Sequence, residues 1–135
     1  MSDENKPTGR KKIMLVDNEP DVTYAIESVL DENGFEVDSF NDPVLACDTF
    51  KANYYDLVVL DIKMPKMDGF ELYECLRAKD QKAKICFLTA SEMFYEALRK
   101  ARNLFGDVLG EKYFIQKPTR SAHLIQQLQE IIDSE

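Results

Sequence analysis

The chain has few cysteines, one histidine and no long apolar run, and each shortage excludes a class of protein. Its three cysteines are odd in number and widely spaced over 135 residues, which argues against a disulfide framework and a zinc site. We therefore expect Cys47, Cys75 and Cys86 to serve as small hydrophobic side chains in a reducing compartment. The single histidine, His123, cannot form a metal cluster, and we expect it at a solvated position of an amphipathic helix.

The chain also has fewer basic residues than acidic residues. The 17 Lys and Arg residues stand against 25 Asp and Glu residues, giving a net charge of −8. Direct binding of nucleic acid needs a basic surface, so this balance argues against it. No apolar run approaches the length that crosses a bilayer, and the polar N-terminus lacks the apolar segment of a secretory signal. We expect a cytoplasmic protein with protein partners and no membrane contact.

The length of the chain is usual for one compact domain. Residues 1–11 are polar and contain little that could pack, which predicts a flexible N-terminal tail. Residues 12–135 then form the folded domain.

Short apolar runs alternate with helical patterns along this domain. Continuous apolar runs of this length are typical of strands buried on both faces of a parallel sheet. These runs are residues 13–16, 57–60, 85–88 and 113–115. The alternating segment 35–40 predicts a half-exposed edge strand, and amphipathic patterns predict helices that begin near Pro20, Pro43, Gly69, Phe94 and Ser121. We therefore predict an α/β fold: a five-stranded parallel sheet with helices on both faces, doubly wound in the flavodoxin-like (βα)5 manner. The fourth helix should span residues 94–105, with an extra loop at 106–111.

Polar residues follow the four buried runs. They are Asp17, Asp61, Thr89 and Lys117. In an open α/β sheet the carboxyl ends of the strands meet at one edge, so these side chains should converge on one crevice. Carboxylate oxygens suit Mg²⁺, and a carboxylate can attack phosphorus to form an aspartyl phosphate. A threonine hydroxyl can bind a phosphoryl oxygen, and a lysine can balance its charge.

Four segments together resemble the receiver domain of two-component response regulators. Residues 58–69, with the sequence Val-Val-Leu-Asp-Ile-Lys-Met-Pro-Lys-Met-Asp-Gly, resemble that family's phosphoacceptor motif. Residues 15–21, Leu-Val-Asp-Asn-Glu-Pro-Asp, resemble its acidic-pair motif. Residues 88–90 and 116–118 are similar to its switch hydroxyl and its lysine–proline motif. The resemblance extends from about Lys12 to the C-terminus.

The resemblance implies a role for each matching residue. Asp61 would be the phosphoacceptor, with Thr89 and Lys117 beside it and Phe114 as the aromatic switch partner of Thr89. Mg²⁺ would be the cofactor, and its ligands would come from Asp17, Asn18, Asp61 and the backbone carbonyl of Lys63. The family also implies a small residue at Ala90 and a cis bond before Pro118.

The resemblance also implies partners. A histidine kinase or histidine phosphotransfer protein would supply the phosphoryl group. A downstream protein would read the face built from the fourth helix, fifth strand and fifth helix. Because the chain ends with its fifth helix, we expect a stand-alone receiver that signals through a partner and is not a turnover enzyme.

Two departures from the family pattern leave alternatives open. Asn18 replaces the second acid of the pair, which predicts weaker metal binding and would also suit a pseudo-receiver that acts as a phosphorylation-independent interaction module. The segment between Thr89 and Lys117 is longer than usual, which bears on partner choice. A Mg²⁺-dependent phosphohydrolase of the haloacid-dehalogenase type is disfavoured, because it needs an aspartate where this chain has Lys63.

Overall fold

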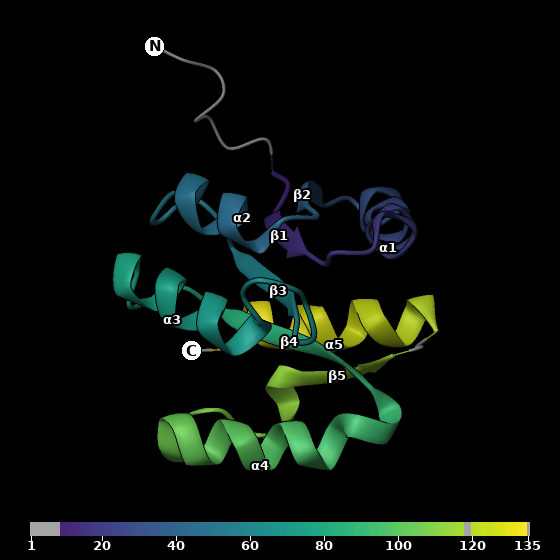
Figure 1. The fold of residues 1–135 in the computed structure, drawn as a ribbon. Helices are drawn as coiled ribbons and strands as arrows, with labels where there is room; N and C mark the ends of the chain where they lie inside the picture. The colour runs from purple at the N-terminus through teal and green to yellow at the C-terminus, as the bar shows by residue number, and fades with distance from the viewer. Residues whose placement is uncertain (1–8, 118–119, 135) are drawn as a thin grey trace.

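Five parallel strands form one sheet in the computed structural model, which describes residues 9–117 and 120–134 (Figure 1). The strands are β1 (Lys12–Val16), β2 (Glu36–Phe40), β3 (Leu57–Asp61), β4 (Ile85–Ala90) and β5 (Phe114–Lys117). They lie in the order β2-β1-β3-β4-β5, so the strand order reverses between β1 and β3. The predicted doubly wound parallel sheet is confirmed, and the reversal places a crevice at the carboxyl ends of these two strands.

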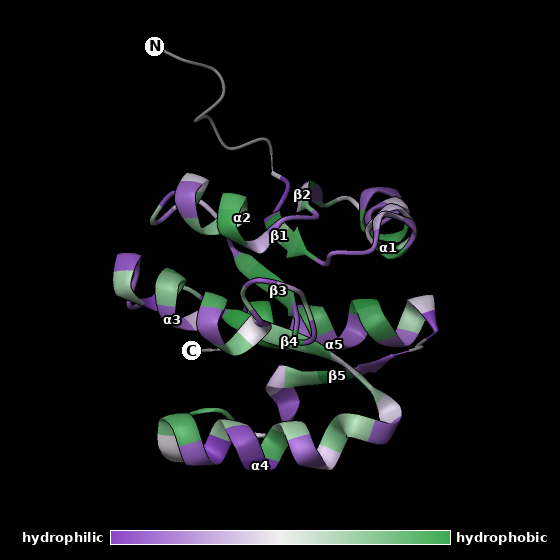
Figure 2. Ribbon diagram, viewed as in Figure 1, coloured by the Kyte–Doolittle hydropathy of each residue, from purple (hydrophilic) through white to green (hydrophobic). Residues whose placement is uncertain are grey.

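Helices cover both faces of the sheet. Helices α1 (Pro20–Glu32) and α5 (Ser121–Asp133) pack on one face, and α2 (Pro43–Thr49), α3 (Gly69–Lys79) and α4 (Phe94–Phe105) pack on the other. Successive side chains of a strand point to opposite faces, so Met14 belongs to the core under α2, α3 and α4 while Leu15 belongs to the core under α1 and α5. Figure 2 shows the apolar strands at the centre of these layers.

The alternation of apolar and polar residues in segment 35–40 correctly predicts that β2 is an edge strand. Strand β2 pairs with β1 alone, and its residues are half-buried or exposed, as the mixed pattern of segment 35–40 predicts. Its outer position explains why apolar and polar residues alternate there, since only one face of β2 packs on the core.

The segment after α4 differs from the expected loop. Helix α4 has the predicted bounds and ends at Phe105, and the φ of +77° at the following Gly106 is a conformation that suits glycine. Two short 3₁₀ helices then follow, η3 (Gly106–Val108) and η4 (Glu111–Tyr113). Tyr113 therefore lies in a helical turn, and β5 begins one residue later than its apolar run indicates.

The prediction that all three cysteines are isolated hydrophobic side chains is wrong for two of them. Cys47 of α2 and Cys75 of α3 form a disulfide with their Cα atoms 6.1 Å apart. Their separation of 28 residues gives no sign of this, because the contact arises only when α2 and α3 share one face of the sheet. Cys86 is a buried free thiol, as expected, and burial raises its pKa. His123 is exposed on α5, also as expected.

Two expectations fall outside the described residues: the conformation of the bond before Pro118, and the N-terminal tail over residues 1–8. At the described start of the chain, the Arg10 guanidinium donates to the carbonyl oxygens of Gly34 and Phe35 at 3.2 and 3.0 Å.

None of the helices in the described part of the chain has the length and apolar character needed to cross a membrane.

Candidate functional site

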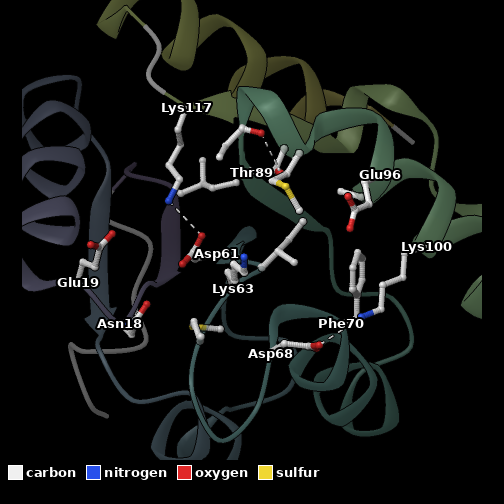
Figure 3. A pocket seen from close by; sticks show the side chains of 16 residues that line it. Asn18, Glu19, Asp61, Lys63, Asp68, Phe70, Thr89, Glu96, Lys100 and Lys117 are labelled. Carbon is white, nitrogen blue, oxygen red and sulfur yellow. Dashed lines mark hydrogen bonds and ion pairs between the residues drawn. The ribbon is translucent and has the colours of Figure 1, made fainter.

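Three charged side chains meet at the carboxyl ends of β1, β3 and β5. The Lys117 Nζ lies 3.1 Å from Asp61 Oδ1 and 3.4 Å from Asp17 Oδ2. Figure 3 shows the lysine side chain extending from β5 toward the Asp61 carboxylate. The residues are 56 and 100 positions apart from Lys117 in sequence, so the parallel sheet alone brings them together.

Asp17 is fixed by hydrogen bonds of both its side chain and its backbone. Its side chain has no exposed surface, and its Oδ1 accepts a hydrogen bond from the Glu19 backbone N–H at 2.9 Å. Its own N–H donates to the Phe40 carbonyl at 3.0 Å, and the Asn41 amide donates to its carbonyl at 2.7 Å. The carboxylate therefore has a fixed position beside Lys117. Sequence reasoning missed Asn41, although it directly follows strand β2 as the other site residues follow theirs.

The electrostatics of the site are set by burial and by neighbouring charge. Asp61 is only 5% exposed, and this burial raises its pKa. The negative charge of Asp17 raises the pKa of Asp61 further, while Lys117 lowers it by less, so it stays above the ordinary value. Burial lowers the pKa of Lys117, but the charges of Asp61 and Asp17 outweigh burial and the pKa is raised. The site holds surplus negative charge that a further cation would balance.

Thr89 lies near the end of β4 and lines the cleft, whereas Phe114 is the first residue of β5. Thr89 is 4% exposed and its hydroxyl donates to the Ala90 carbonyl at 3.3 Å, a long bond that is easily exchanged for another. Phe114 is buried and stacks on Phe87, with ring centroids 5.2 Å apart. The hydroxyl is therefore near the crevice and the aromatic ring is inside the core.

A cleft of about 530 Å³ opens above these residues. Asn18, Asp61 and Lys63 line it, as the sequence leads one to expect, together with Thr89 and Lys117. The cleft extends under α4, to residues that no local pattern of the sequence marks as part of a site. They are Met93, which directly precedes α4, and Glu96, Ala97 and Lys100, which share one face of the helix. Figure 3 shows Glu96 and Lys100 on the α4 side of the cleft.

The start of α3 is packed tightly against the end of β3. The Gly69 N–H donates to the Ile62 carbonyl at 2.8 Å, and a Cβ on Gly69 would lie 2.5 Å from the Asp61 carbonyl oxygen. Asp68 caps the helix through a reciprocal pair of hydrogen bonds with Glu71. Lys100 of α4 lies 3.8 Å from the Asp68 carboxylate, so both helices meet at this corner of the cleft.

The donor atoms fit a hard divalent cation. Asp61 supplies a carboxylate and Asn18 an amide oxygen at the cleft, and Lys63, whose backbone carbonyl is the expected ligand, also lines it. The Asp17 carboxylate has no exposed surface and contacts Lys117 beside Asp61. Within residues 9–117 and 120–134 no three His, Cys, Asp or Glu side chains gather closely enough to bind a metal. An all-oxygen set of low charge, in a cleft with surplus negative charge, suits Mg²⁺ that keeps several waters.

Comparison with known proteins points to one family. The family model described as the response regulator receiver domain matches residues 13–129. The transcriptional regulatory protein TctD of Salmonella typhimurium is 29% identical over 133 residues, covering 90% of this chain and 59% of that protein. The probable transcriptional regulator ycf29 of Porphyra purpurea is 33% identical over 122 residues, covering 89% of this chain and 56% of that protein. The chain thus spans little more than half the length of these two curated relatives.

Solved structures give the same result. The non-phosphorylated HemR receiver domain of Leptospira biflexa superposes with a TM-score of 0.77 at 26% identity, covering 93% of this chain and 97% of that one. The receiver domain of a sensor histidine kinase from Pseudomonas aeruginosa, with a magnesium ion in its active-site cleft, gives 0.75 at 28% identity and covers 93% and 99%. Response regulator TrrA of Thermotoga maritima, in complex with Mg²⁺ and BeF, gives 0.72 at 29% identity and covers 90% and 98%.

Proposed function

The chain belongs to the response regulator receiver family, and on that premise we propose that Asp61 accepts a phosphoryl group in a Mg²⁺-assisted reaction. Receiver domains are signalling domains, not conventional turnover enzymes. The observation that carries the proposal is the contact of a buried Asp61 with Lys117 and Asp17 at the point where the strand order reverses. A buried carboxylate beside an ammonium group lies in an open cleft, and a bound Mg²⁺ would balance the surplus negative charge and let a phosphoryl group approach Asp61.

The side chains of this site can carry out the transfer. An oxygen of Asp61 forms the new bond to phosphorus, and the bond between phosphorus and the donor's leaving atom breaks. Lys117 holds the carboxylate in place, and its ammonium then pairs with a phosphoryl oxygen. The Thr89 hydroxyl exchanges its long bond to Ala90 for another phosphoryl oxygen. Bound Mg²⁺ would neutralise charge on the transferred group, held by Asp17, Asn18, Asp61 and the Lys63 carbonyl.

The partners follow from the family. We propose that a histidine kinase or a histidine phosphotransfer protein donates the phosphoryl group, in the cytoplasm. We propose that a downstream protein reads the face of α4, β5 and α5. Several relatives are named as transcriptional regulators and one structural neighbour is part of a sensor histidine kinase, so receivers of this kind serve different outputs. Signalling through a protein partner, without direct contact to nucleic acid, remains a prediction that rests on the net charge of −8.

Asn18 favours one second candidate, a receiver that binds its partner without phosphorylation. The described residues contain no three-acid metal cluster, and an amide brings no charge to Mg²⁺. Against this candidate, Asp61, Thr89 and Lys117 are all present and close to the same cleft.

Incubation with phosphoramidate, with and without Mg²⁺, tests the proposal. Intact mass should show one added phosphoryl group that needs Mg²⁺ and is removed by base. Asp61→Asn should abolish the modification, and Asp48→Asn, an exposed carboxylate on α2, should leave it unchanged. An unmodified wild type that still binds its partner would instead establish the second candidate.

A further inference from the structure

The disulfide between Cys47 and Cys75 closes a loop that contains the phosphoacceptor. The loop includes β3 with Asp61 and the segment that carries Lys63, and it ends within α3. We propose that this cysteine pair is a reversible redox site that controls how firmly the Asp61 loop is held. The proposal adds a regulatory input to Asp61 and in that respect rests on the function proposed above.

The pair is placed to exchange as a closed two-thiol unit. Both cysteines are half-buried at the packed boundary between α2 and α3, and partly exposed cysteines are those that exchange with small thiols. Cys86 has no exposed surface and belongs to the core on the opposite face of the sheet. It therefore offers no competing disulfide. The Lys79 ammonium also donates to the Cys47 carbonyl, so α2 and α3 remain in contact when the disulfide opens.

Helix α3 connects the disulfide to the site. Cys75 lies six residues after Gly69, the first residue of α3, which is about 9 Å along the helix axis. Gly69 in turn is bonded to the Ile62 carbonyl at 2.8 Å and leaves no room for a Cβ beside Asp61. A helix is a stiff body over this distance, so a restraint at Cys75 limits the motion of the loop between Asp61 and Gly69.

The oxidation step is an ordinary exchange with a small-molecule disulfide such as oxidised glutathione. The thiolate of one cysteine attacks the small disulfide and releases one small thiol. The second cysteine then attacks the mixed disulfide and releases the other. The protein loses two protons and two electrons, and the small disulfide gains them as two thiols. Reduced glutathione reverses both steps. In a compartment rich in thiols such a bond is transient, as disulfides with a sensing role are.

Thiol counting tests the redox site directly. Wild type equilibrated in oxidised and reduced glutathione mixtures is quenched with acid and alkylated in denaturant, so that buried Cys86 also reacts, and free thiols are counted by intact mass. We expect three free thiols under reducing conditions and one under oxidising conditions, with a reversible change between them. Cys86→Ala should keep the transition and Cys47→Ser should lose it. Three free thiols in every mixture would overturn the proposal, as would a bond that reductant never opens in the folded protein.

Coupling to Asp61 is tested on the wild type with and without reductant. Closing a 28-residue loop should raise the melting temperature on the order of 10 °C, and reductant should not change that of Cys47→Ser. Hydrogen exchange over residues 62–69 should be several-fold slower in the oxidised form. Phosphorylation of Asp61 should be faster in that form, by roughly two- to tenfold. Equal exchange and equal phosphorylation in both redox states would overturn the coupling. A normal thiol transition with no phosphorylation in either state would support the redox site and overturn the proposed function.

Discussion

At the scale of single residues, the cleft is governed by two carboxylates that approach the same ammonium group. Lys117 lies within 3.4 Å of both Asp17 and Asp61. The surplus negative charge destabilises the metal-free fold and at the same time prepares the site for a cation. Residues that serve function at the expense of stability are common in active sites.

Asp61→Asn should therefore stabilise the metal-free protein. The pKa of Asp61 is raised by burial and by Asp17, so its charged form costs folding free energy. That cost is full at pH values above the folded pKa and disappears as the pH falls through it toward the unfolded value of about 3.9. We expect a gain of about 1 kcal/mol at pH 7, shrinking in acid. Urea unfolding at several pH values measures it.

The matched control is Asp48→Asn on α2. This exposed carboxylate should change stability by less than about 0.5 kcal/mol at any pH. The pKa of Lys117 is also raised, so its contribution is fully present below the unfolded value of about 10.4 and is lost only as the pH rises through the folded value. The titration of Lys117 therefore does not contribute to the pH dependence of stability that is measured in acid. A loss of stability at pH 7 in Asp61→Asn would contradict the electrostatic account.

Asn18→Asp should tighten Mg²⁺ binding. A unit charge a few ångströms from the ion is worth several kcal/mol at an effective dielectric near ~20, and most of this is offset because the new carboxylate must be desolvated. We expect a net gain of roughly 1–3 kcal/mol, about ten- to a hundredfold in affinity. Calorimetric titration of both proteins decides it. Asn103→Asp, which adds the same charge at an exposed position of α4, is the control. Equal affinities for wild type and Asn18→Asp would mean that Glu19, which lines the cleft, or a water network already supplies the missing charge.

At the scale of elements, α3 is the part of the scaffold that defines the phosphoacceptor loop. Its first residue is in contact with the end of β3, its cap is bonded to Glu71, and its middle is tied to α2 by the disulfide. Helices that begin at a site in this way fix backbone positions that a loop alone would leave loose.

Gly69→Ala should disturb both stability and phosphorylation. The added Cβ would lie 2.5 Å from the Asp61 carbonyl oxygen and 2.8 Å from the Ile62 Cα, both backbone atoms that cannot turn away. Overpacking of this kind typically costs about 1–3 kcal/mol, and here it also displaces Asp61. Denaturant unfolding and the phosphorylation assay measure the two effects.

Gly110→Ala is the control for that substitution. Gly110 has no atoms within 4 Å of an added Cβ, and its φ of −83° is open to alanine. Alanine there should leave stability unchanged or raise it by about 0.4–1 kcal/mol. If Gly69→Ala and Gly110→Ala had the same effect on stability and on phosphorylation, the close packing of α3 against β3 would not be what fixes the position of Asp61.

At the scale of the whole molecule, the sheet and its polar strand ends could be predicted because they depend on local patterns. Continuous apolar runs report strands buried on both faces, and a parallel sheet then brings Asp17, Asp61 and Lys117 to one edge by topology alone. The disulfide and the α4 wall of the cleft could not be predicted in the same way. They depend on which helices share a face and on how far α4 reaches over the strand ends, which no local pattern encodes.

Strand β5, which lies between α4 and α5, is connected to the site differently from helix α1. Lys117 and Phe114 both belong to β5, between α4 and α5, and the stacking of Phe114 on Phe87 carries any shift of β5 into the core under α4. Helix α1 meets the site through the turn that follows β1 and through Thr23, whose hydroxyl accepts a hydrogen bond at 3.1 Å from Asn41. A new phosphoryl group on Asp61 should therefore act first on β5 and its neighbours, as a change in local charge that biases a two-state element.

In the wild type, phosphorylation should change hydrogen exchange mainly in α4, β5 and α5. In Lys117→Ala, some phosphorylation should remain, but most of that change in hydrogen exchange should be lost. Without the ammonium, the phosphoryl oxygens have no cation on β5, so the strand is not drawn toward Asp61 even when the acyl phosphate forms. Exchange is followed by mass spectrometry after phosphoramidate treatment, with intact mass reporting the modified fraction. Lys82→Ala, an exposed lysine after α3, is the control and should respond like wild type. Exchange changes confined to α1 would contradict transmission through β5. So would a full response in Lys117→Ala, because the change would then reach the surface without an ammonium group on β5 to pair with the phosphoryl oxygens.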